Sequence, residues 1–255
     1  AIRSCQRQLT GVSPVVRQLL AATAIWSSPL TRAMQTAMVG LQPIIAARCC
    51  RSATPIALRV NARERQKLGS VDCVGVATDE GCGQRAVKLL HQLLDSEEAR
   101  SPNLSQWWSG NQPAAKSATR SVQEVTVRAA AAASFETTEV QRRWWLSGAE
   151  DSAAVGDRIS ILLEQAKHCP DDAIVIVGHS LIFRQLFRTC LHPAFRERSP
   201  ALAATLTDAK LQHCQVACCV LDFDLGPQMI ADVSLLLAEQ GDDGQCLLRI
   251  ASAGT

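Results

Sequence analysis

The sequence predicts an α/β fold with a largely parallel sheet, and three observations predict it. Apolar runs of strand length alternate with longer segments whose apolar residues recur at helical spacing. The run at 173–177 (AIVIV) is continuously apolar, as expected of a strand buried on both faces. The 255 residues are 47% hydrophobic, which suffices for a sizeable core. We therefore expect a single domain over 1–255, with a loop and helical insertion at about 97–147.

The first predicted pair of elements is a strand at 24–28 (AIWSS) followed by a helix. Ser28 suits the N-cap of that helix and Pro29 its first position. The helix would bury an apolar face of six residues: Leu30, Ala33, Met34, Ala37, Met38 and Leu41. A second strand is predicted at 54–60 (TPIALRV) and a second helix at about 80–98.

The middle of the chain carries weaker signals. Residues 100–121 are rich in polar residues and predict an exposed loop, and the alanine run at 128–134 predicts a helix. The tryptophan pairs at 107–108 and 144–145 are typical of packing anchors. Beyond residue 151 the pattern predicts a helix over 155–166, the strand at 173–177, a helix after His179, and closing strands at 216–223, 230–237 and 246–250.

Composition argues against several classes of function. The formal net charge is +2, without the basic excess that binds nucleic acid, and no run of about 18 apolar residues predicts a membrane span. The eleven cysteines are odd in number, irregularly spaced and without a CxxC pair, so we expect neither a metal site nor a disulfide framework. The cysteines predict reduced, mostly buried thiols in an intracellular protein, which we expect to be cytoplasmic. We expect no cofactor. The first residue is Ala1, so we expect an incomplete N-terminus.

The strand at 173–177 runs into Gly178-His179-Ser180, which raises the possibility of a nucleophilic serine. These residues fit the first half of the G-x-S-x-G elbow on which α/β-hydrolases place their nucleophile. The fifth position is Ile182, a poor substitute for the glycine that allows close helix packing. A catalytic triad would also need an acid and then a histidine after Ser180. The histidines that follow are His192 and His213, and the acids considered for the triad are Asp208 and Glu197. A serine hydrolase that uses Ser180 is therefore the third of our hypotheses.

The alternative chemistry uses His179 as an anion ligand. The strands at 24–28 and 173–177 both run through small residues into a helix, and in a parallel sheet both turns lie at the carboxyl edge, where open α/β folds bind ligands. Helix N-termini at this edge favour anions. Arg32 lies in the first turn of its helix, and a guanidinium matches two phosphate oxygens. Since His179 can donate to the same group, these residues predict an anion site.

Several segments also resemble a known family. The stretch SSPLTRAMQTA (27–37) resembles the second signature of the histidine phosphatase superfamily, which has the phosphoglycerate mutase-like fold. The stretch IVIVGHSLIFRQL (174–186) resembles its third signature. The segments NARERQKLG (61–69) and WWLSGAED (144–151) are similar to the segment of the family's general acid and to the approach to the third signature. The resemblance covers roughly residues 9–224.

The resemblance implies a three-layer α/β/α fold and a function. Arg32 would bind the transferred phosphoryl oxygens, with Ser28 and Ser180 beside it. His179 would hydrogen-bond the phosphoryl group and stabilise its charge, and Glu64 would protonate the leaving oxygen. The implied activity is that of a phosphomonoester phosphatase, or a mutase, acting through a phosphohistidine on a phosphorylated small molecule or a phosphoprotein. Nearby arginines could contact the substrate, although exposed arginines are usually solvated: Arg59, Arg63 and Arg65.

The sequence departs from the family at the nucleophile. In the family this is a histidine in an Arg-His-Gly motif on the first strand, and no such motif occurs among the five histidines: His91, His168, His179, His192 and His213. We therefore expect the first strand to be missing from this chain, and the chain as given to be inactive. Either it is a fragment of an active enzyme, or it is a non-catalytic phosphate-binding or protein-interaction protein of the same fold.

Overall fold

The computed structural model describes residues 18–19, 21–41, 55–67, 70, 73–77, 81–88, 134–146, 148–212, 215–240 and 246–251. The chain divides into two compact units. One unit spans residues 24–151 and 176–179, and the other spans residues 1–23, 152–175 and 180–255. The polar loop predicted at 100–121 and residues 128–133 of the predicted helix at 128–134 lie outside the described residues, and residue 134 is not helical.

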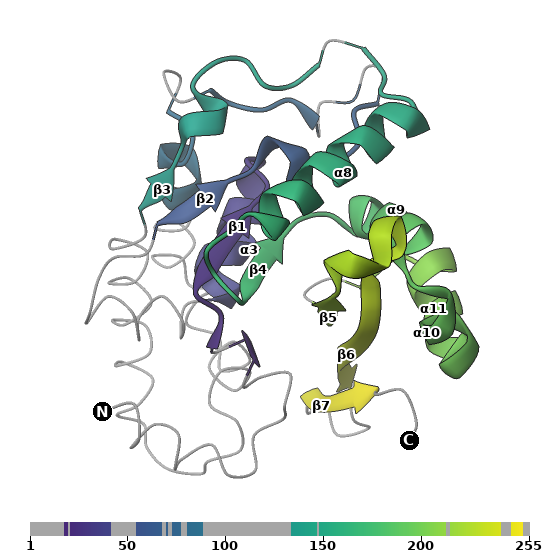
Figure 1. Ribbon diagram of the computed structural model, residues 1–255. Helices are drawn as coiled ribbons and strands as arrows, with labels where there is room; N and C mark the ends of the chain where they lie inside the picture. The colour runs from purple at the N-terminus through teal and green to yellow at the C-terminus, as the bar shows by residue number, and fades with distance from the viewer. Residues whose placement is uncertain are drawn as a thin grey trace, which may run out of the picture. The chain divides into compact units, whose positions relative to one another are not determined.

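A parallel sheet of four short strands carries the predicted α/β pattern. The strands β1 (Ala24–Ser27), β2 (Ile56–Leu58), β3 (Phe135–Glu136) and β4 (Ile174–Val177) lie in the order β3-β2-β1-β4 (Figure 1). The pairs β1–β2 and β2–β3 are parallel. Thr23 N donates to Ala173 O and Ser28 N donates to Val177 O, so β4 runs in the same direction as β1. The α/β class and the parallel sheet are thus confirmed. The strand β3 was not predicted.

The helix α3 (Thr31–Gly40) follows β1 and packs against it. All six residues of its predicted apolar face are buried, which confirms the helical spacing. The helix begins at Thr31 rather than at Pro29, because its first turn closes on Leu30: Leu30 O accepts hydrogen bonds from Ala33 N and Met34 N. The polar side chain that precedes this turn is Ser28, whose Oγ accepts from Leu30 N at 3.3 Å.

The strand β4 differs from its prediction. All four of its residues are partly buried, whereas the continuous apolar run predicted a strand fully buried on both faces. In the part of the chain that the structure describes, β4 is the edge strand of its sheet, with a strand neighbour on the β1 side alone. A run of apolar residues shows that a strand can be buried, but it does not show which neighbours cover it.

Short turns follow β2 and β3 and bring distant segments together. The 3-10 turn η1 (Val60–Ala62) follows β2, and η4 (Thr138–Val140) follows β3.

Trp144 and Trp145 meet edge to face with ring centroids 5.6 Å apart, and Trp144 Nε1 donates to Val76 O. The Trp144 ring lies directly against Gly75, where a side chain would collide with it. This tryptophan pair is therefore the packing anchor that was predicted.

The second unit combines helices with an antiparallel sheet. Its helices are α8 (Ser152–Lys167), α9 (Ser180–Cys190), α10 (Pro193–Arg198) and α11 (Pro200–Asp208). The strands β5 (Val216–Leu221), β6 (Ile230–Gln240) and β7 (Cys246–Ala251) follow, with the turn η5 (Phe223–Gln228) between the first two. The three closing strands are thus confirmed, and they form an antiparallel sheet of their own. The hydrophobic core of this unit includes Ile159, Phe187, Phe195 and Ile230.

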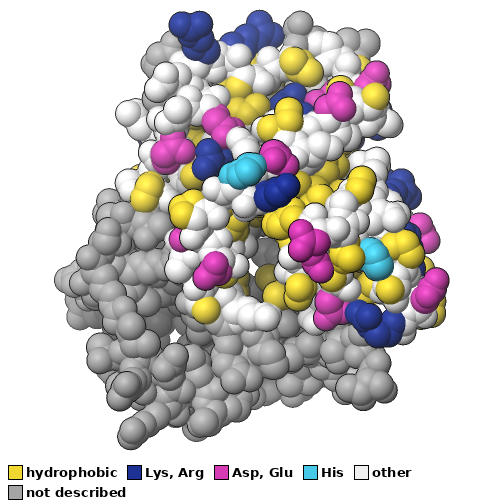
Figure 2. Space-filling view, in the orientation of Figure 1, with side chains coloured by type: hydrophobic (Ala, Val, Ile, Leu, Met, Phe, Trp, Pro, Cys, Tyr) yellow, Lys and Arg dark blue, Asp and Glu magenta, His cyan; other side chains and the backbone are white. Residues whose placement is uncertain are grey.

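The surface carries charges of both signs. On the face shown in Figure 2, acidic and basic side chains are interspersed over the described residues, in keeping with the near-neutral composition. No helix in the described ranges is both long enough and apolar enough to cross a bilayer.

A matched pair of substitutions in α8 tests the packing of the second unit. Ile159 is 2% exposed and Ile161, on the same helix, is 50% exposed. We expect Ile159→Ala to lower the free energy of unfolding by about 2–5 kcal/mol, because it leaves a cavity. Ile161→Ala should change it by less than about 0.5 kcal/mol. Urea unfolding followed by circular dichroism measures both, and equal losses would contradict the packing described here.

Candidate functional site

Backbone hydrogen bonds hold the carboxyl ends of three parallel strands together. Arg59 N, just after β2, donates to Ser27 O at the end of β1 over 2.8 Å. Ser28 N, just after β1, donates to Val177 O at the end of β4, also over 2.8 Å. The residues that follow the three strands therefore start from one edge of the sheet, where ligands of such sheets bind.

The structure brings Ser28 and His179 into direct contact at this edge. The distance from Ser28 Oγ to His179 Nε2 is 2.8 Å, although 151 residues separate them in the chain. Both residues are buried, His179 with 7% of its surface exposed and Ser28 with none. The resemblance assigned Ser28 to substrate binding, but its hydroxyl is covered by protein and bonded to His179. The residue with surface to offer a ligand in this pair is His179.

Arg32 lies on the strand-to-helix turn that begins at Ser28. It is the second residue of α3, and it is exposed. Its backbone carbonyl accepts from Thr36 Oγ1, as usual inside a helix. The structure thus places Arg32, an exposed residue, in the first turn of the helix that begins three residues after Ser28.

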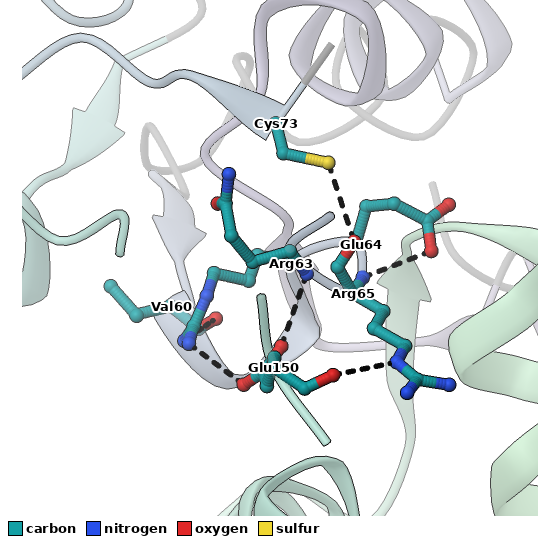
Figure 3. A network of polar contacts seen from close by, with 7 residues as sticks. Val60, Arg63, Glu64, Arg65, Cys73 and Glu150 are labelled. Carbon is teal, nitrogen blue, oxygen red and sulfur yellow. Dashed lines mark hydrogen bonds and ion pairs between the residues drawn. The ribbon is translucent and has the colours of Figure 1, made fainter. Parts of the chain in front are cut away.

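Glu64 lies two residues beyond η1, in a segment that follows β2. It is half-buried, and its Oε1 accepts a hydrogen bond from the backbone N of Arg65 (Figure 3). No hydrogen bond among the described residues joins Glu64 to His179 or Ser28. Its proposed role as an acid therefore rests on the resemblance and on its position after a strand of the same parallel sheet.

Glu150 holds the segment around Glu64 from both sides (Figure 3). Its Oε1 accepts from Arg63 Nη2 at 3.0 Å and its Oε2 from Gln66 N at 3.2 Å. Its backbone carbonyl accepts from Arg65 Nε at 2.8 Å, and its own N donates to Gln66 O at 3.0 Å. The ion pair with Arg63 is buried, with side chains 2% and 7% exposed. Glu150 stands in the WWLSGAED segment, but sequence reasoning gave it no role.

A second arginine is also held by acids. Arg59 Nη1 lies 2.8 Å from Glu139 Oε1, while Glu139 Oε2 accepts from Val60 N. The Arg59 guanidinium lies 4.7 Å from the centre of the Trp26 ring. Partial burial acts to raise the pKa of Glu136, but hydrogen bonds from Thr138 and the charge of Arg59 outweigh it and lower that pKa.

The three arginines that sequence reasoning treated together have different surroundings. Arg63 is buried against Glu150, and Arg59 is partly buried against Glu139, so neither is the solvated side chain that was expected. Arg65 is exposed, as expected, while its Nε donates to the carbonyl of Glu150. A charge count along the chain could not distinguish them, because their acidic partners lie about eighty residues away.

Among the residues that the structure describes, Ser180 does not have the surroundings of an activated nucleophile. It is the first residue of α9, and in the described ranges no hydrogen bond joins its hydroxyl to a histidine or an acid. His192 caps α10, where its Nδ1 accepts from Ala194 N at 3.2 Å. His213 lies outside the described residues, so the structure leaves its pairing with Glu197 or Asp208 untested.

Comparison of the chain with family models, with curated proteins and with solved structures finds no match. The function is therefore argued from the residues and their geometry.

Removal of the Glu150 side chain tests the network around Glu64. Glu150→Ala leaves Arg63 buried without its carboxylate, so we expect a loss of about 3–5 kcal/mol in the free energy of unfolding. The control is Asp232→Ala, which breaks an ion pair with Arg198 whose side chains are 45% and 47% exposed. That change should cost at most about 1 kcal/mol. Chemical denaturation compares the two, and similar losses would show that the Arg63–Glu150 pair does not hold the segment.

Proposed function

We propose that the edge of the sheet around His179 binds the phosphoryl group of a phosphomonoester, as part of a phosphatase or mutase of the histidine phosphatase type. The proposal depends on one observation above all: the hydrogen-bonded contact between Ser28 and His179 where two parallel strands end. Ser28 and His179 themselves lie in the two segments, 27–37 and 174–186, that resemble the family's signatures. The contact joins these segments across 151 residues.

Each proposed role follows from the chemistry of the side chain. The guanidinium of Arg32 is exposed near the start of α3 and can donate to two phosphoryl oxygens at once. His179 donates to the same group and stabilises the charge that develops during transfer. Glu64, in the segment braced by Glu150, would give its proton to the leaving oxygen. Ser180 follows His179 directly and can offer its hydroxyl or backbone N to the phosphate.

The proposed phosphoryl transfer needs a nucleophile that these residues do not supply. The printed sequence contains no Arg-His-Gly motif. Among the described residues β4 has a strand neighbour on the β1 side alone, so a further strand that carries a histidine could pair with its other edge, next to His179. We therefore propose that the 255 residues bind a phosphorylated ligand but do not turn it over alone.

A second function is favoured by the same missing motif. A protein with Arg32, Ser28 and His179 but no nucleophilic histidine would recognise a phosphorylated small molecule or a phosphoprotein without cleaving it. The two functions share the phosphate-binding site and differ in whether a nucleophilic histidine is present beside it. A measurement of phosphate binding tests the shared site, and a measurement of phosphate release distinguishes the two functions.

Phosphate binding tests the proposed site. We expect purified 1–255 to bind inorganic phosphate, and His179→Gln and Arg32→Ala each to weaken the binding about 10- to 100-fold, the effect of losing a hydrogen bond to a charged group. Arg142→Ala removes another exposed arginine of the same unit and should leave the affinity unchanged. Isothermal titration calorimetry measures all four proteins. If the two site variants bind as well as the parent chain, the phosphate lies elsewhere and the proposal fails.

Turnover is the second measurement. We expect no release of phosphate from a generic aryl phosphate by purified 1–255, because the transfer lacks its nucleophile. Phosphate release that persists in His179→Ala would show that a different site performs the reaction. Phosphate release that His179→Ala abolishes would place the reaction at this site and show that the chain supplies its own nucleophile, either His179 itself or a residue near it.

A further inference from the structure

Ser28 and Ser27 are both fully buried, but among the described residues it is the Ser28 hydroxyl, and not the Ser27 hydroxyl, that contacts His179. Ser27 Oγ donates to the carbonyl of Ser28 at 3.0 Å. Ser28 Oγ has two partners: it accepts from Leu30 N at 3.3 Å and lies 2.8 Å from His179 Nε2. Ser28 also donates its backbone N–H to Val177 O, two residues before His179. It therefore contacts the segment of His179 with both its backbone and its side chain.

The direction of the Ser28–His179 hydrogen bond follows from counting protons. A serine hydroxyl has one proton to donate and two lone pairs to accept with. Leu30 N–H occupies one lone pair, so the proton remains for another partner. In the described part of the chain, His179 Nε2 is the acceptor that lies within reach of this proton. If Nε2 carried the ring proton instead, the Ser28 hydroxyl would be buried with its own proton unbonded, which is costly.

We infer that Ser28 is a positioning residue for His179: its hydroxyl donates to Nε2 and holds the neutral imidazole in the form that carries its proton on Nδ1. Which nitrogen of a histidine bears the proton is set by the hydrogen bond that the other nitrogen makes. Ser28 thereby fixes both the orientation of the ring and the nitrogen from which it donates. The inference rests on the proposed function for its purpose, because a donor held in place in advance needs no reorganisation when the anion arrives.

Nitrogen NMR of histidine-labelled protein tests the inference directly. At pH 8 an unperturbed imidazole is neutral, and its two nitrogens have different chemical shifts according to which one carries the proton. The His179→Gln variant identifies the signals of His179. We expect the parent chain to show the Nδ1–H form. In Ser28→Ala we expect a shift towards the Nε2–H form or a mixture of the two, and in Ser27→Ala no change.

Phosphate titration of the same variants gives the second measurement. We expect Ser28→Ala to weaken phosphate binding about five- to tenfold, the effect of losing one neutral hydrogen bond, and Ser27→Ala to leave it unchanged. Ser27→Ala removes an equally buried hydroxyl from the next position, so it controls for effects on folding. Urea unfolding of both variants confirms that each is folded under the conditions of the titration.

The possible results separate the inference from the proposed function. An Nε2–H form in the parent chain, or His179 signals that Ser28→Ala leaves unchanged, would overturn the inference, whatever the affinity for phosphate. Signals that respond as expected in a chain that binds no phosphate would support Ser28 as the residue that orients His179, while the proposed function fails.

Discussion

The candidate site depends on the alignment of strand ends in a parallel sheet. Two backbone hydrogen bonds, Arg59 N to Ser27 O and Ser28 N to Val177 O, hold the ends of β1, β2 and β4 together. Because the strands are parallel, they all end at the same edge of the sheet. The residues that follow them therefore lie close together, and even short side chains can meet there. The Ser28–His179 contact is the side-chain consequence of this backbone arrangement.

Burial divides the residues of the site into two kinds. Ser28, Arg63 and Glu150 are covered by protein. Ser28 Oγ contacts His179, and Glu150 accepts hydrogen bonds from Arg63 and from the backbone around Glu64. Arg32 is exposed and Glu64 half-buried. The buried residues hold their neighbours in position, whereas the exposed residues are open to solvent. Sites that bind a charged group with polar groups positioned in advance show the same division. A buried polar group that supports its neighbours is also costly to leave unpaired, so these contacts stabilise the fold as well.

Local features of the sequence predicted local features of the structure. Helical spacing identified the buried face of α3, and apolar runs of strand length identified β1, β2 and β4, because these patterns lie within one segment. The exposure of β4, the short strand β3 and the role of Glu150 could not be predicted in this way. They depend on partners far along the chain: Glu150 meets Arg63 across 87 residues. The antiparallel pairing of β5, β6 and β7 likewise comes from contacts between segments, while each strand by itself was predicted.

The partly buried edge strand β4 has a consequence for the association of the protein with other chains in solution. Its four residues, Ile174–Val177, are all β-branched and uncharged, with no proline or lysine to discourage pairing with another chain. Segments of this composition are templates for aggregation when they lie at an open edge. Asp171 and Asp172 stand just before the strand and act as gatekeeper charges on one side of it. In the part of the chain that the structure describes, this edge is therefore the place at which a second chain can add a strand.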